Sequence, residues 1–104
     1  MMATSVKVAS VSEIAPGTAK QVEANGQPIA LFNVGGKFYA LSNTCTHRGG
    51  PLAEGILEEI TVECPWHGAR FDVTTGAVEG PPARDAVKSY KVIVEGTDVK
   101  IEIS

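Results

Sequence analysis

Every cysteine and every histidine of the chain lies between residues 45 and 67, in the stretch CTHRGGPLAEGILEEITVECPWH. They form two pairs, Cys45 with His47 and Cys64 with His67, spaced as CxH and CxxH. Thiolates and neutral imidazoles are ligands for zinc and for iron. Because each pair combines one sulfur with one nitrogen, the spacing indicates two loops that hold metal between them.

Four interpretations of these residues remain open at this point. If the four residues were ordinary core and surface residues, their pairing in both stretches would be a coincidence. A disulfide between Cys45 and Cys64 would leave both histidines without a role. A structural zinc site can use two cysteines and two histidines, but it generally takes both sulfurs from one knuckle and both histidines from another element. The mixed pairs suit a [2Fe-2S] cluster, in which the cysteines hold one iron and the histidines hold the other. Such a cluster is neutral when oxidised, whereas an all-cysteine cluster is anionic, so histidine ligation raises the reduction potential.

The composition is that of one soluble globular domain. The chain has 104 residues, of which 43% are hydrophobic and 20% are charged, so it is too short for two ordinary domains. A formal net charge of -3, without any run of lysine or arginine, argues against a surface for nucleic acid or anionic membranes. Neither a membrane-spanning stretch nor a secretory signal is recognisable, so we expect a cytoplasmic protein.

Turn signals at short intervals predict an all-β fold built from antiparallel hairpins. Three loops rich in glycine and proline interrupt the second half of the chain; the first two carry the four metal-ligand candidates, and the third, GPPAR, carries none. Strands are expected at residues 19–22, 27–34, 37–42, 60–63, 69–73, 87–94 and 99–103.

The segments CTHRGGPL and CPWHGARFD resemble the two ligand motifs of Rieske iron-sulfur proteins, and TGAVEGPPA resembles the proline-bearing loop of that family. The resemblance covers essentially the whole chain. It implies a Rieske-like fold of antiparallel sheets in a single domain, residues 1–104, with a cluster-binding subdomain at approximately 43–82. It also implies one Rieske-type [2Fe-2S] cluster, with Cys45 and Cys64 on one iron and His47 and His67 on the other.

The chain departs from two branches of that family. Gly50 and Trp66 stand where the proteins of cytochrome bc complexes carry an additional disulfide, and no histidine is left for the mononuclear iron of a ring-hydroxylating oxygenase. The chain also lacks the GxGxxG fingerprint and the length of a nicotinamide or flavin domain.

We therefore expect an electron carrier without a catalytic site, similar to the ferredoxin components of multicomponent bacterial aromatic-ring dioxygenases. On that resemblance it is a monomer that takes one electron from a flavoprotein NAD(P)H-dependent reductase and passes it to a terminal oxygenase. Two other functions are kept as alternatives, namely the small subunit of a nitrite-reductase-type oxidoreductase and a zinc-stapled interaction module.

Residues beside the ligands bear on partners and on the reduction potential. Arg48 and Trp66 adjoin ligand positions, where a partner protein is expected to dock. In high-potential family members the second motif resembles CPCHGSxYD, whose serine and tyrosine donate hydrogen bonds to cluster sulfurs. Ala69 and Phe71 stand at those two positions and have no side-chain donor. The potential is therefore expected in the lower part of the Rieske range.

Overall fold

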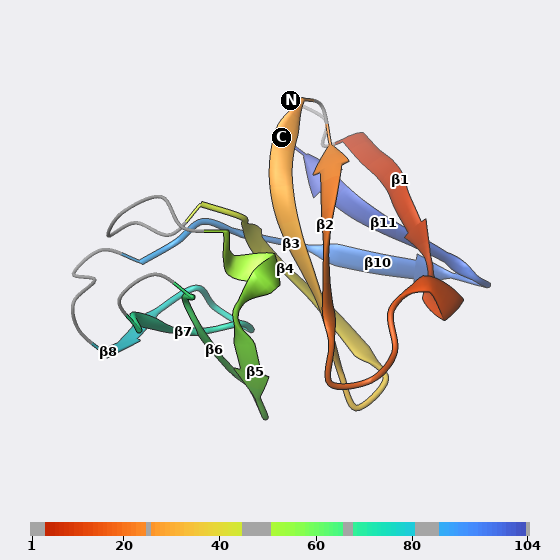
Figure 1. Cartoon of the computed structure of the whole chain (residues 1–104). Helices are drawn as coiled ribbons and strands as arrows, with labels where there is room; N and C mark the ends of the chain where they lie inside the picture. The colour runs from red at the N-terminus through yellow and green to blue at the C-terminus, as the bar shows by residue number, and fades with distance from the viewer. Residues whose placement is uncertain (1–3, 25, 45–50, 66–67, 81–85, 104) are drawn as a thin grey trace.

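The structure is a computed structural model and describes residues 4–24, 26–44, 51–65, 68–80 and 86–103. Within these residues the chain forms β-strands and two short 3-10 helices and has no α-helix, which confirms the predicted all-β class (Figure 1). The elements are β1 (Thr4–Ser10), η1 (Val11–Glu13), β2 (Ala19–Ala24), β3 (Gln27–Val34), β4 (Lys37–Ser42), η2 (Leu52–Glu54), β5 (Ile56–Glu58), β6 (Thr61–Glu63), β7 (Arg70–Asp72), β8 (Val78–Gly80), β9 (Ser89–Tyr90), β10 (Val92–Glu95) and β11 (Asp98–Ile103).

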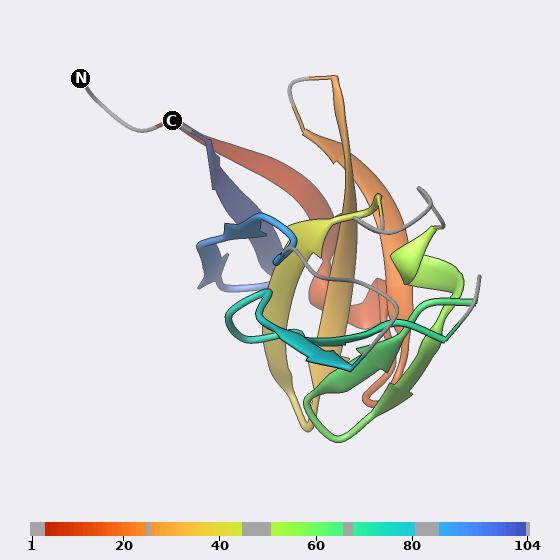
Figure 2. The same cartoon turned by 90° about the vertical axis from the view of Figure 1, so that its left-hand side faces the viewer.

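The strands make three antiparallel sheets, with strand orders β1-β11-β10, β2-β3-β4-β9 and β5-β6-β7-β8. The β2-β3-β4 meander lies between the other two sheets, and the view in Figure 2 looks onto the β5–β8 side of the molecule. No helix among the described residues is long and apolar enough to cross a membrane.

Strand β3 is buried on both faces, which explains its almost continuous apolar sequence. Successive side chains of a strand point to opposite faces of the sheet. Ile29 and Leu31 accordingly pack in one core with β1 and β11, while Ala30 and Phe32 pack in a second core with β6 and β7. All four side chains are fully buried. One strand therefore joins the core of the terminal strands to the core beneath the predicted ligand loops.

The predicted strand at residues 87–94 is two strands in the structure. Ser89 and Tyr90 pair with β4, and from Val92 onward the chain pairs with β11 instead. The change of sheet falls at Lys91, whose carbonyl accepts a hydrogen bond from the Glu102 N–H. The segment thus links the central sheet to the β1-β11-β10 sheet, and its alternation is broken because its two halves face different neighbours.

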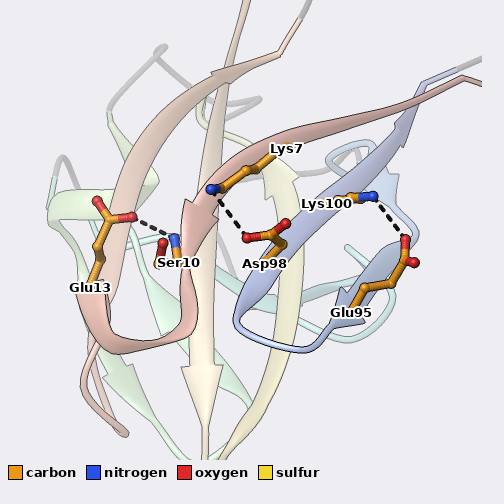
Figure 3. A network of polar contacts seen from close by, with 6 residues as sticks. All are labelled: Lys7, Ser10, Glu13, Glu95, Asp98 and Lys100. Carbon is orange, nitrogen blue, oxygen red and sulfur yellow. Dashed lines mark hydrogen bonds and ion pairs between the residues drawn. The ribbon is translucent and has the colours of Figure 1, made fainter.

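Exposed polar contacts surround the turn after β1 (Figure 3). The Glu13 carboxylate accepts hydrogen bonds from the Lys20 ammonium and from the Ser10 backbone N–H. The Lys20 hydrogen bond is the main cause that lowers the pKa of Glu13 below its usual value, and the Ser10 bond adds to it. Because these groups are exposed, each pair stabilises the fold only slightly. Two further ion pairs of this kind are Lys7 with Asp98 and Glu95 with Lys100.

Candidate metal centre

Of the four ligand residues predicted from the sequence, the structure describes Cys64. Cys45, His47 and His67 lie outside the described residues, as do Arg48 and Trp66. The structure nevertheless describes the chain on both sides of each predicted loop. The geometry of the site is therefore built from the bases of the three loops.

Cys64 directly follows β6, where the β6–β7 hairpin opens into the second predicted ligand loop. Its backbone N–H donates to the carbonyl of Ala69 at 2.7 Å, just beyond the last strand pair, Glu63 with Arg70. Gly68 has a φ of 77°, a left-handed conformation that glycine adopts without steric cost. These contacts close the base of the second predicted ligand loop and fix the backbone that carries the Cys64 sulfur.

The first predicted ligand loop is closed at its base in a similar way. Thr44 and Pro51 form an isolated antiparallel bridge, so the chain leaves and re-enters at the same place. The backbone N–H of Leu52 donates to the carbonyl of Asn43 at 2.8 Å. Residues 45–50 therefore span two points that are held together by main-chain contacts.

The proline-bearing segment begins beside the second loop. Arg70, one residue after Ala69, pairs with Gly80 at the end of β8. Beyond residues 81–85, which lie outside the described part of the chain, the N–H of Val87 donates to the carbonyl of Gly76 at 2.9 Å. Through this bond the chain that follows residues 81–85 returns to the β7–β8 hairpin.

The bases of these loops share one apolar core. Leu52, Cys64, Ala69 and Phe71 belong to it, and each is at most 2% exposed. A thiolate in such a place is unfavourable unless its charge is compensated, and binding to iron provides this compensation. A buried cysteine at a hairpin end, beside the base of the loop that carries Cys45 and His47, fits the donor set of two sulfurs and two imidazoles. The residues present are therefore compatible with a [2Fe-2S] cluster.

The opposite face of the β5–β8 sheet is polar and acidic. The Arg70 guanidinium on this face pairs with Glu63 at 3.1 Å, and the Thr61 hydroxyl donates to Glu79. Ile56 is 59% exposed at the edge of this face. A shallow depression on the face is lined by Ile56, Glu58, Glu59, Thr61, Glu63, Arg70 and Glu79. The sheet thus separates an apolar core from a negatively charged surface.

The Rieske [2Fe-2S] domain family matches the chain over residues 4–91. The chain belongs to this family. It is 42% identical to the biphenyl dioxygenase ferredoxin subunit of Pseudomonas sp. (strain KKS102), over 97% of this chain and 94% of that protein. The fold matches the ferredoxin of carbazole 1,9a-dioxygenase from Nocardioides aromaticivorans IC177 with a TM-score of 0.91 at 34% identity, covering 94% and 96% of the two chains. A complex of reduced oxygenase and oxidized ferredoxin in carbazole 1,9a-dioxygenase gives a TM-score of 0.88 at 37% identity, covering 93% and 91%.

The protein is thus a Rieske-type ferredoxin that carries one [2Fe-2S] cluster, as the sequence motifs predicted. The fold class and the cofactor are confirmed, whereas the assignment of the four ligand residues stays a prediction. Sequence reasoning missed Asn43, Leu52 and Gly76, which hold the bases of the loops. Asn43 was recognisable only as a polar residue two positions before the CxH motif, a signal too weak to interpret alone.

Proposed function

We propose that Cys45 and Cys64 bind one iron of the cluster and that His47 and His67 bind the other. The burial of Cys64 at the end of the β6–β7 hairpin supports this assignment. When bound, the cluster supplies reversible one-electron chemistry. The cluster-binding subdomain would comprise approximately residues 43–82 of a single domain that spans residues 1–104.

The residues of the chain would hold the ligands and exclude water from the inner side of the site. The Cys64–Ala69 hydrogen bond fixes one cysteine, and the core around Leu52 and Phe71 supports both loops from below. A rigid ligand frame limits rearrangement when the charge changes, which favours fast electron transfer. No further chemistry is assigned to the chain, and we propose that it has no catalytic site of its own.

The protein would take electrons one at a time from a flavoprotein NAD(P)H-dependent reductase and deliver them to the terminal oxygenase of an aromatic-ring dioxygenase system. The single observation that carries this proposal is the 42% identity to a biphenyl dioxygenase ferredoxin subunit over almost the full length of both chains. We further propose that the protein is cytoplasmic, because a reducing compartment keeps the two cysteines available as thiolate ligands. We also propose that it is a monomer.

Rapid-mixing absorption spectroscopy tests this function. The holoprotein is mixed anaerobically with NADH and a flavoprotein reductase of a biphenyl dioxygenase system, and the reduced protein is then mixed with the matching terminal oxygenase. Bleaching of the visible bands in the first step and their return in the second step are expected. A holoprotein that no such reductase reduces, or whose electron no terminal oxygenase accepts, would contradict the proposed role while leaving the cluster itself in place.

A further inference from the structure

Among the described residues, the two buried polar side chains are Asn33 and Asn43, at 4% and 6% exposed. A buried amide destabilises a fold unless hydrogen bonds satisfy it. Asn33 is satisfied far from the predicted ligand loops, because its Nδ2 donates to the Ile14 carbonyl and its Oδ1 accepts from the Gly36 N–H. Asn43, in contrast, lies at the base of the first ligand loop.

Within the described part of the chain, Asn43 makes three hydrogen bonds to two separate elements. Its own N–H donates to the carbonyl of Pro28 in β3 at 3.1 Å, and its carbonyl accepts from the N–H of Leu52 at 2.8 Å. Its side-chain Oδ1 accepts from the N–H of Ala53 at 2.8 Å. The residue thus connects the central sheet, the start of the first loop and η2.

The two N–H groups that donate to Asn43 are the first donors of η2. The first N–H groups of a helix have no partner within the helix, and a side chain at the preceding position usually caps one of them. The residue preceding η2 is Pro51, which has no side-chain acceptor, and no side-chain cap is present there. Asn43 supplies this cap from across the loop.

We propose that Asn43 is a positioning residue for the cluster: by capping η2 across the loop, it holds the two ends of the loop that carries Cys45 and His47 beside the core that contains Cys64. The inference rests on the proposed ligand set through Cys45 and His47. Asn43 lies at one end of the loop and η2 at the other, so the cap forms only when the two ends of the loop lie together. Leu52, the first residue of η2, is fully buried in the core that contains Cys64. The same cap therefore holds the end of the first loop, at Pro51 and Leu52, against the core that contains Cys64.

The test compares Asn43→Ala with Asn33→Ala in the holoprotein, since both variants remove a buried amide. In Asn43→Ala we expect cluster loss, followed by the decay of visible absorbance with an iron chelator present, to be about tenfold faster than in Asn33→Ala. A tenfold factor corresponds to about 1.4 kcal/mol, within the range for lost helix caps. The electron paramagnetic resonance spectrum of the reduced protein should shift in Asn43→Ala alone. Equal decay rates and unchanged spectra in both variants would overturn the proposal.

Hydrogen exchange of the wild-type protein, resolved to single amides, tests the cap even if Asn43→Ala does not accumulate. The Ala53 amide should exchange as slowly as the Gly36 amide, whose acceptor is Asn33. Exchange of Ala53 at the rate of an unstructured peptide would refute the cap. Wild-type protein that binds no iron would instead refute the proposed function, and the exchange result would still report on the cap itself.

Discussion

Replacement of Gly76 by alanine should destabilise the base of the proline-bearing loop. Gly76 has a φ of 82° and is buried in the β7–β8 hairpin. A Cβ added there would lie 2.1 Å from the carbonyl oxygen of Val87, far inside van der Waals contact. The backbone of one of the two residues must therefore move by about 1 Å, and the hydrogen bond from the Val87 N–H to the Gly76 carbonyl is lost with it.

Gly17 provides a matched control, because its φ is 83° and a Cβ on it would meet nothing within 4 Å. The left-handed backbone costs an alanine about 1–2 kcal/mol at either position. Only Gly76→Ala adds the steric conflict, at about 1–3 kcal/mol for an overpacked site. For a domain of this size 1 kcal/mol changes the melting temperature by about 4–8 °C. Gly76→Ala should therefore melt about 10 °C below Gly17→Ala.

Thermal unfolding of the holoprotein, followed by far-ultraviolet and visible circular dichroism, measures both effects. The visible signal, which reports the cluster, should be lost in Gly76→Ala before the far-ultraviolet signal, because the displaced segment leads into the loop at residues 81–85. In Gly17→Ala the two signals should be lost together. Equal melting temperatures for the two variants would show that the approach of Gly76 to Val87 does not constrain the protein.

Three further predictions concern the potential, the partners and the response to acid. Ala69→Ser and Phe71→Tyr should each raise the midpoint potential, measured by protein-film voltammetry, by tens of millivolts, with roughly 100 mV as the upper limit for one donor. Both positions are fully buried. A hydroxyl that does not reach sulfur would therefore lower the free energy of unfolding by about 1–3 kcal/mol instead. Arg48→Glu, beside His47, should slow electron exchange with a partner more at low salt than at high salt, and equal rates at low salt would assign Arg48 to the solvated surface. The pKa of Glu13 is lower in the folded state than in the unfolded state. Its contribution to stability is therefore present above its usual pKa and is lost as the pH falls through the folded value. In Glu13→Gln the melting temperature should accordingly fall less steeply on the acid side of its pH profile.

Sequence patterns predicted the central hairpins because their turns and strands agree locally. The turn at Gly35-Gly36 joins β3 and β4, the strands expected at residues 27–34 and 37–42, and the structure places Val34 opposite Lys37. Strands β1, β5 and β8 were missed. The register of β1 shifts between Lys7 and Ala9, and β5 and β8 are the two edge strands of the β5-β6-β7-β8 sheet. These strands form because neighbouring strands pair with them, which the local sequence does not encode.

The candidate site was predictable in its ligand types but not in its support. Cys64 and His67 are chemically conspicuous because the chain has few residues of either type. Asn43, in contrast, acts on Ala53, ten positions along the chain, through a side-chain contact that exists only after the loop closes. The constraint on Gly76 likewise arises from Val87, which the fold brings close. Contacts between distant residues of this kind follow from tertiary structure alone.

The central claim is that the two loops hold one [2Fe-2S] cluster through two thiolates and two imidazoles. Analysis of iron, zinc and acid-labile sulfide in the protein as purified, together with the electron paramagnetic resonance spectrum of its reduced form with and without nitrogen-15 histidine, tests this claim most directly. We predict about two irons and two sulfides per chain, no stoichiometric zinc, and nitrogen couplings from both His47 and His67. One zinc per chain without labile sulfide, or a reduced cluster with no histidine nitrogen coupling, would contradict the claim.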